Sequence, residues 1–384
     1  MSLKCFGDGS YIYDFWNGIK YDDNPLGLTG IWKSEQMPLY PYSISGIAIA
    51  LLKLIGAPYQ VFVVIGRMIN LLLFSLITLL CIKICPGIKT TILTFSFVPA
   101  VVWMETSFSY DSLNLAMANL FICYCIRCRD KQKVTIKDLI IIMAIMIVFA
   151  PIKYIYIVMA LFVFVIPLSH IQIKNKKRIA LIGGVALLIM ILILAKLRGS
   201  EILYLLGSGA DGRFAGTSDT TYTLAYVIRH PFTIILVFFK TIIEKSEFYF
   251  LRSLSGENYT NFVPHTLVII LAIIVVRILI GAHGFNEVSK RDRVVAWMTF
   301  TVMSIVIFTS FLFLYSVIPS ENGMIGIVDG VQGRYFLPLF LILPLMLSIK
   351  KFKLEEHQKK NYLFGLLIVN IVITLFKYSG ALIS

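Results

Sequence analysis

The chain has 384 residues, 58% of them hydrophobic and 15% charged, with a formal net charge of +14. An ordinary soluble domain is only about half apolar. The composition therefore excludes an ordinary soluble protein and predicts an all-α integral membrane protein. The positive charges lie in blocks beside apolar runs, which favours topology signals and anionic lipids over nucleic acid as their partner. The sequence has no P-loop and no GxGxxG motif, which argues against a nucleotide-driven pump.

The first 59 residues form a segment of their own. Residues 1–40 are acidic and aromatic, and the apolar stretch at 43–56 reaches only about 20 Å as a helix, too little to cross a bilayer. We expect 1–59 to be an acidic, aromatic segment with an interfacial helix on the outer face. A strained span, with 1–40 in the cytoplasm, remains the alternative. Residues 60–384 are expected to be a polytopic transmembrane domain with an outer loop at 199–262.

Apolar runs predict about ten transmembrane helices in this domain. They are expected near 60–82, 90–106, 110–127, 137–168 (as a hairpin), 178–198, 263–281, 294–317, 334–349 and 361–379. The run 137–168 is too long for one helix, and Pro151 near its middle splits it into a tight hairpin. Several runs are shorter than about 20 residues, which favours local thinning of the bilayer or burial among neighbours. At 224–250, charged residues lie on both sides of a short apolar stretch, and this pattern predicts a second interfacial helix.

Basic residues assign a side to each connector. Clusters of Lys and Arg occupy 127–137, 174–178, 290–293 and 350–360. The positive-inside rule places all four in the cytoplasm, and every block agrees with the alternation of spans. The connectors at 151–154, 199–262 and 318–333 are therefore expected on the outer face.

Carboxylates at the outer ends of spans are candidates for chemistry, because charges within or beside a membrane are costly and often functional. Asp111 begins the span 110–127, where it fits a general base, a metal ligand or a hydroxyl-binding group. Simple capping of that helix is an equally good interpretation. A divalent cation therefore stays open as a cofactor. No metal cluster is predicted, since Cys123, Cys125 and Cys128 do not have a standard zinc spacing.

Cations at outer span ends are candidates for binding an anionic headgroup. Arg334 lies in Gly330-Val-Gln-Gly-Arg-Tyr-Phe-Leu-Pro338, where its guanidinium offers a bidentate fork for phosphate and two glycines allow close backbone approach. Tyr335 follows in the same motif, and anchoring of both side chains at the membrane interface is the alternative. Lys153 and Tyr154 lie at the tip of the outer hairpin, where Lys153 either receives the same headgroup or snorkels.

Two further positions complete the candidate substrate-binding residues. Arg67 and Asn70 fall on one face of the span 60–82, where Arg67 needs either a carboxylate partner or a ligand. His230 precedes Pro231 in the outer loop. A single histidine of this kind is more often structural than catalytic.

The order of these motifs resembles a known family. The motifs are Pro38-Leu-Tyr-Pro41, Arg67-x-x-Asn70, Ser109-Tyr-Asp111, Lys153-Tyr154, His230-Pro231 and Gly333-Arg334-Tyr-Phe-x-Pro338. Over roughly residues 38–350 the chain resembles bacterial multi-pass membrane proteins known as domain of unknown function 2142, which in turn are similar to GT-C glycosyltransferases. The resemblance implies a GT-C-like fold, a polyprenyl-phosphate-linked sugar as donor, and transfer at the outer face of the bacterial cytoplasmic membrane.

The resemblance also implies a first span followed by an essential acidic residue. The sequence has no such span or acidic motif, and only Asp8 and Asp14 lie near the corresponding place. We therefore expect the chain to lack the first helix, and we take Asp111, Asp14 and Asp8 as candidate catalytic carboxylates. Expected partners are the lipid-linked sugar and membrane lipids. A transporter or lipid flippase and a noncatalytic assembly partner remain alternatives.

Overall fold

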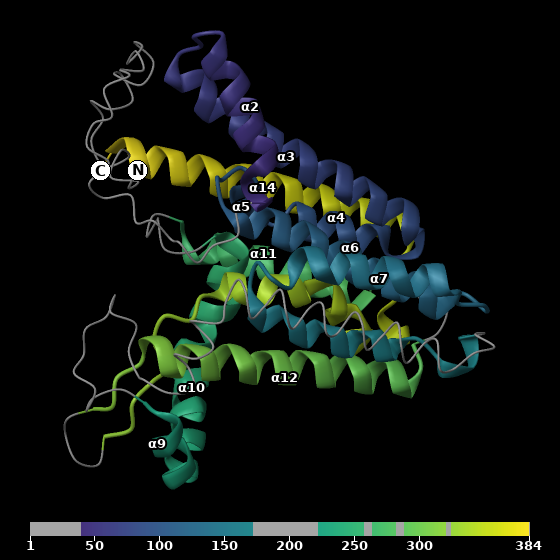
Figure 1. Ribbon diagram of the computed structural model, residues 1–384, viewed down its shortest axis with the longest axis vertical. Coiled ribbons are helices and arrows are strands. Elements are labelled where there is room, and N and C mark those ends of the chain that lie inside the picture. Colours follow the sequence, from purple (N-terminus) through teal and green to yellow (C-terminus); the bar gives the residue numbers. More distant parts are fainter. Residues whose placement is uncertain (1–39, 172–221, 257–262, 282–287, 320–323, 384) are drawn as a thin grey trace. The chain divides into compact units, whose positions relative to one another are not determined.

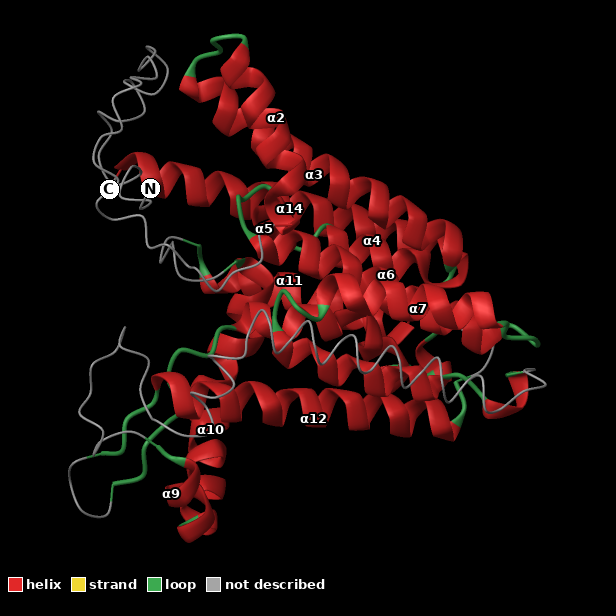
Figure 2. Cartoon of the chain, in the orientation of Figure 1, coloured by secondary structure: helices red, strands yellow, loops and turns green. Residues whose placement is uncertain are grey.

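A computed structural model of the chain describes residues 40–171, 222–256, 263–281, 288–319 and 324–383. These residues form α-helices and 3-10 helices, and the described part contains no strand (Figure 2). The prediction of an all-α chain is confirmed for them. Three sets of predicted features lie outside the described residues: the expected span at 178–198, the candidates Asp8 and Asp14, and the parts 199–221 and 257–262 of the outer loop.

Three described helices are long and apolar enough to cross a membrane. They are α3 (Tyr59–Ile84), α12 (Lys290–Tyr315) and α14 (Glu356–Ile383), and each matches an expected span (Figure 1). In the part of the chain that the structure describes, these helices are those of an all-α membrane protein.

The expected span at 90–106 is broken. It consists of α4 (Lys89–Ser96) and α5 (Pro99–Glu105), and the helical segments on the two sides of the break meet at 80°. A proline has no N–H to continue the helix, so Pro99 begins a new one, and the segment expected to span at 90–106 is two helices instead of one. The pair adds a fourth crossing if it counts as one broken span.

The chain divides into two compact units. Unit 1 comprises Met1–Leu120, Leu254–Gly284 and Ile349–Ser384, and unit 2 comprises Phe121–Ser253 and Phe285–Ser348. The helix α6 (Tyr110–Asp130), which matches the expected span 110–127, contributes residues to both.

In unit 1, α2 (Ser43–Leu54) folds back on α3. The chain reverses at Gly56, whose φ of +67° suits glycine, and Ile49 then packs against Gly66. The outward face of α2 is also apolar, with Ile44, Ile47, Leu51 and Leu54 exposed. The helix expected at 43–56 is confirmed, and its place on the outer face of the membrane stays a prediction.

In unit 1, several helix ends lie beside the basic connector at 350–360. Leu354 N–H donates to Gly281 O at 2.9 Å, which joins the connector to the end of α11 (His265–Gly281). Lys89 Nζ lies 3.9 Å from a Glu356 carboxylate oxygen, which joins the starts of α4 and α14. The connector at 350–360 is one of the basic clusters that the sequence assigns to the cytoplasm, and the end of α11 and the start of α4 lie beside it.

In unit 2, the predicted hairpin is present. Helix α7 (Ile136–Phe149) stops just before Pro151, and a 3-10 helix, η4 (Tyr154–Val165), returns along it. Val134 N–H, before α7, donates to His170 O, after η4, at 2.8 Å. The two arms are therefore antiparallel, with the turn and the free ends at opposite ends of the hairpin.

The basic connectors of unit 2 meet at the free ends of this hairpin. Arg129, at the end of α6, donates from Nε and Nη2 to one oxygen of Asp292, at the start of α12, at 3.0 and 2.7 Å. Arg291 donates to Val165 O at 2.7 Å, and Arg293 donates to Ser348 O at 3.0 Å. As in unit 1, the segments that the sequence assigns to one side lie together.

The expected span at 334–349 has an unexpected form. It is a 3-10 helix, η7 (Gly333–Ile342), followed by one turn of α-helix, α13 (Leu343–Leu347). A 3-10 helix rises about 2.0 Å per residue against about 1.5 Å in an α-helix, so these residues reach about 28 Å. That is close to the hydrocarbon thickness of about 30 Å, and the crossing expected here stays a prediction.

The helix expected at 224–250 is longer than predicted. It bends at His230 into α9 (Leu224–Arg229) and α10 (Pro231–Ser255). Its 25 residues reach about 37 Å, but it is not among the described helices that are apolar enough to cross a membrane, in keeping with the prediction that its apolar stretch is too short to span. The remaining elements are short 3-10 turns: η2 (Tyr40–Tyr42), η3 (Pro86–Ile88), η5 (Leu168–His170) and η8 (Lys350–Phe352).

Candidate functional site

Two cations and two tyrosines converge in unit 2, and we call them the Tyr335 cluster. Lys153 Nζ lies 4.4 Å from the centroid of the Tyr335 ring, and Arg334 Cζ lies 5.7 Å from it. The buried Tyr156 hydroxyl donates to Tyr335 O at 3.3 Å. A cation within about 6 Å of an aromatic centroid is attracted by the ring quadrupole. The structure thus brings together three predicted substrate-binding residues from two distant segments.

Local structure explains how each member of the cluster is placed. Lys153 adopts an extended backbone in the turn that Pro151 forces between α7 and η4. Tyr156 follows in the first turn of η4, and Arg334 and Tyr335 begin η7. Lys153, Arg334 and Tyr335 are half-buried, so their charges are screened less than they would be on an open surface.

The two glycines beside Arg334 have packing roles. Gly330 has φ +78°, and a Cβ added there would lie 3.2 Å from Phe311 on α12. A Cβ on Gly333 would lie 2.7 Å from Tyr249 O and 2.9 Å from Ser253 Cα on α10. The close backbone approach expected at these glycines is seen toward neighbouring helices, and approach to a ligand stays a prediction. They let η7 approach its neighbouring helices, which fixes where Arg334 stands.

An aromatic wall surrounds the start of η7. The Phe311 ring lies 4.9 Å from that of Tyr335, and Phe336 lies 6.1 Å from both Tyr249 and Phe308, between ring centroids. Aromatic pairs at these separations stabilise one another beyond their buried area. The charges of the cluster are therefore held against a rigid apolar support.

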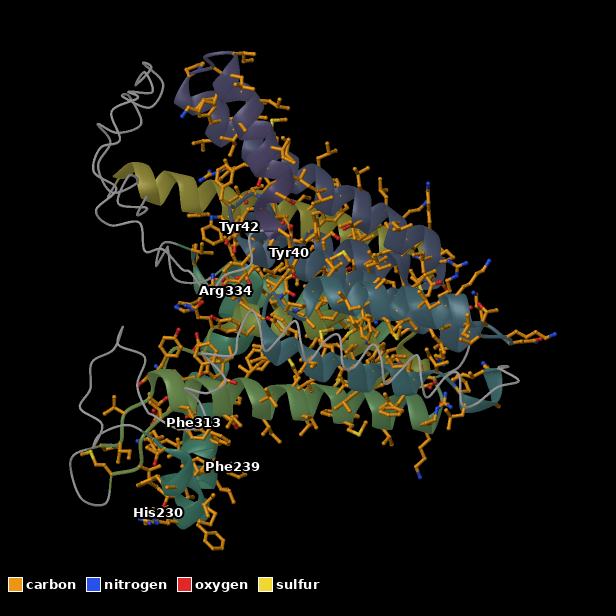
Figure 3. All side chains as sticks on the ribbon, viewed as in Figure 1. Tyr40, Tyr42, His230, Phe239, Phe313 and Arg334 are labelled. Carbon is orange, nitrogen blue, oxygen red and sulfur yellow. The ribbon has the colours of Figure 1, made fainter. Side chains whose placement is uncertain are left out.

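His230 does not join this cluster. Its ring is exposed at the bend between α9 and α10 and lies 4.6 Å from that of Tyr226. Figure 3 places it well away from Arg334. Its observed role is to stack on its own helix. The side chain of Tyr154 lies outside what the structure describes.

A second polar site lies in unit 1, at the turn between α5 and α6. Asn70 Nδ2 donates to Ser107 O at 2.9 Å, and Phe108 packs directly on Gly66, so α3 holds this turn in place. Asn70, predicted to bind substrate, therefore has a structural partner. Arg67, one turn earlier, has a buried Nε without a hydrogen-bond partner among the described residues. The carboxylate partner that the sequence left open for Arg67 is not found among them.

Two carboxylates flank this turn, and we call them the acidic pair, Glu105 and Asp111. Glu105 is 0% exposed and Asp111 is 5% exposed. Ser112 Oγ donates to Glu105 Oε2, while Glu105 Oε1 is buried without a hydrogen-bond partner among the described residues. The Asp111 N–H donates to Ser109 Oγ at 3.1 Å, so the capping contact at the start of α6 comes from Ser109.

Tyr42 lies close to the acidic pair. Its ring meets that of Tyr110 edge-on at 6.5 Å, and burial raises the pKa of its phenol, which the charge of Asp111 raises further. Glu105, Ser112 and Tyr42 were not predicted as site residues. The available signal was a glutamate inside an apolar run, six positions before an aspartate at a helix start.

Comparison with known proteins gives one match. The sequence model of a family described as predicted membrane protein (DUF2142) matches residues 26–343. No curated protein and no solved structure matches the chain. The matched range contains the Tyr335 cluster and the acidic pair.

Proposed function

The chain belongs to this family of predicted membrane proteins, and from that premise we propose that it is an envelope glycosyltransferase. It would take a sugar from a polyprenyl-phosphate donor at the outer face of the bacterial cytoplasmic membrane. The observation that carries the proposal is the convergence of Lys153 and Arg334 on the Tyr335 ring. A noncatalytic assembly partner or a lipid transporter would use the same headgroup without sugar transfer.

The cluster suits a phosphate that gains charge during reaction. When a sugar leaves a lipid phosphate, negative charge develops on the phosphate oxygens, and cations already in place stabilise it without reorganisation. Arg334 supplies a planar fork for two oxygens, and Lys153 supplies a compact charge. Tyr335 keeps both cations near one point despite their mutual repulsion.

The position of the cluster within unit 2 supports an outer-face site. Lys153 lies at the turn of the α7–η4 hairpin, and Arg291 bonds Val165 at its free ends. The basic connectors gather at those free ends, which the positive-inside rule assigns to the cytoplasm. The hairpin turn would then face outward, where lipid-linked donors are used by the enzymes that the sequence resembles.

Helix α10 supplies an apolar surface for the prenyl chain. Its exposed residues repeat at helical spacing and form one stripe: Phe232, Ile235, Leu236, Phe239, Ile242 and Ile243 (Phe239 is labelled in Figure 3). Near its other end, α10 contacts Gly333, which precedes Arg334. A lipid on the stripe would therefore lie on the helix against which the start of η7 packs.

A carboxylate would remove the proton from the acceptor hydroxyl. Asp111 is the described candidate for this general base, and Asp14 and Asp8 are the others. The proposal includes the expected organisation of the chain. Residues 1–59 form an outer segment, and residues 60–384 form a transmembrane domain of about ten spans with a GT-C-like arrangement.

Transfer of labelled sugar from polyprenyl phosphate in membranes containing the chain tests the proposal. We expect product with the wild type and at least roughly tenfold less with Arg334→Ala. Arg127→Ala, an exposed arginine outside the cluster, is the matched control. Binding of the donor without turnover across a broad acceptor panel would reject the enzyme and favour the assembly partner. Movement of donors into liposomes without sugar transfer would favour the transporter.

A further inference from the structure

The least compensated buried group in the described part of unit 1 is Glu105. Its side chain is fully buried, its Oε2 accepts from Ser112, and its Oε1 has no partner among the described residues. A buried carboxylate is costly unless it is paired, metal-bound or protonated. The charge of Asp111, itself 5% exposed, acts on Glu105 and adds to the negative potential.

We propose that the turn between α5 and α6 holds a divalent cation of the Mg²⁺ or Ca²⁺ class, bound by Glu105 and Asp111. Glu105 Oε1 supplies the first ligand, and the carboxylate of Asp111 supplies the second. Ser112 is a positioning residue, because its hydroxyl engages Oε2 and so fixes the orientation of Oε1. This site goes beyond the proposed sugar transfer and does not depend on it.

The first turns of α6 carry a further oxygen donor. Asn114, one turn along α6 from Asp111, has a buried Oδ1 without a partner among the described residues. No described group of three or more His, Cys, Asp or Glu side chains could hold a metal, so amide oxygens and water would complete the shell. Mg²⁺ typically keeps several waters and uses one or two carboxylates, and Ca²⁺ accepts amide oxygens readily. The donor set excludes the thiolate and imidazole ligands that softer metals prefer.

The turn that carries these ligands is held rigidly. Asn70 fixes Ser107 from α3, and Phe108 packs on Gly66 of the same helix. Ser109 caps α6, which sets the first turn in which Asp111 stands. Ligands held in this way lose little conformational freedom when a cation binds.

The alternative to a bound cation is that Glu105 is protonated. Cation binding and protonation predict opposite results. A proton would leave the carboxyl neutral, and added Mg²⁺ or Ca²⁺ would have no specific effect. A cation site instead requires both carboxylates ionised, and the isosteric Glu105→Gln change would remove one charged ligand while it keeps the Ser112 contact.

Thermal unfolding of the purified full chain in detergent separates them. The protein is stripped with a chelator and titrated with MgCl₂ or CaCl₂, with NaCl at matched ionic strength as control. We expect the unfolding midpoint to rise saturably with at least one divalent ion, and the apparent affinity to fall at least roughly tenfold in Glu105→Gln. Glu356→Gln, an exposed carboxylate of the same unit, should respond as the wild type does.

A second readout covers the case in which Glu105→Gln folds poorly. Mn²⁺ bound to wild-type protein is measured directly by electron paramagnetic resonance, and competition with Mg²⁺ or Ca²⁺ follows. Asp111→Asn should weaken Mn²⁺ binding by a similar factor. A wild-type midpoint that neither ion moves, or Mn²⁺ binding unchanged in Asp111→Asn, would overturn the proposal. Sugar transfer is not measured in either experiment, so its failure would leave this test intact.

Discussion

Lys153 and Tyr335 come from segments far apart in the sequence, yet the ammonium nitrogen of Lys153 lies 4.4 Å from the ring centroid of Tyr335. The Tyr156 hydroxyl, one turn after Lys153, donates to the backbone of Tyr335 at 3.3 Å. Two contacts of different kinds thus join the same two segments. They fix a positive charge beside Arg334 at a defined place.

Arg334→Lys should lower donor affinity if the guanidinium clamps phosphate. A point charge cannot reproduce the planar fork, and loss of a charge-assisted contact costs about 1.5–3 kcal/mol, or roughly ten- to a hundredfold. Binding of a labelled polyprenyl-phosphate sugar to detergent-purified protein measures it. Arg293→Lys is the control, since Arg293 donates to Ser348 O and a lysine can replace that bond. Equal affinity in Arg334→Lys and wild type would rule out the clamp.

Tyr335→Leu should weaken donor binding while Tyr335→Phe should not. The leucine removes the ring that holds two cations, worth about 0.5–2 kcal/mol, which corresponds to roughly two- to thirtyfold in affinity. Phenylalanine keeps the ring, and the hydrogen bond from Tyr156 goes to the backbone of residue 335 and survives both changes. The same binding assay reports both variants. A loss in Tyr335→Phe as large as in Tyr335→Leu would assign the effect to the phenol instead.

Gly333→Ala should destabilise the protein. The added methyl would meet Tyr249 O at 2.7 Å and Ser253 Cα at 2.9 Å, and neither backbone atom can move cheaply. Overpacking of this kind costs about 1–3 kcal/mol, measured by denaturant unfolding in mild detergent. Gly365→Ala is the control, because a Cβ there would meet only Ile274 at an ordinary 3.8 Å. Equal stability of Gly333→Ala and Gly365→Ala would contradict the close approach.

Arg129→Met should be among the most destabilising single changes in unit 2. It leaves the carboxylate of Asp292 buried without the two hydrogen bonds that Arg129 donates at 3.0 and 2.7 Å. Breaking one side of a buried pair costs about 3–5 kcal/mol. Arg127→Met, on the same helix but exposed, should change the unfolding free energy by less than about 1 kcal/mol. Recovery of stability in Arg129→Met/Asp292→Asn would confirm that the uncompensated charge is the cause.

Accessibility of introduced cysteines should report the two sides of unit 2. A cysteine at the exposed Met324 should react with an impermeant thiol reagent applied to intact cells, because the connector 318–333 is predicted on the outer face. One at Lys131 should react only after permeabilisation. The unsubstituted chain controls for its native thiols. Labelling of the Lys131 site from outside would reverse the side assignment.

The sequence was a good guide where one strong physical rule acts alone. The apolar run at 60–82 became α3 (Tyr59–Ile84), since hydrophobic length decides a span. Pro151 correctly marked the turn of the hairpin, because a proline cannot continue a helix. Charge bias also placed Arg129 on the same side as the start of α12, although Arg129 and Asp292 are 163 positions apart in the sequence.

Other features depend on contacts that no local pattern encodes. Gly333 was expected to allow a close backbone approach, but no local pattern showed that the atoms it approaches belong to Tyr249 and Ser253 on α10. The complete burial of Glu105 follows from how the 106–109 turn packs on α3, and not from its neighbours in sequence. Asn70 likewise turned out to hold a backbone carbonyl. Contacts between segments that are distant in the sequence decide each of these three features. A single sequence does not give the distances between such segments.

The 3-10 winding of η7 makes its length adjustable. Ten residues in this form are about 5 Å longer than the same residues in an α-helix, and each residue turns about 120° instead of about 100°. Rewinding the segment Gly333–Ile342 would therefore both retract and rotate Arg334 relative to α13. Arg334 and Tyr335 both lie at the start of this segment, so a change of helical pitch alone would move both of them relative to Lys153.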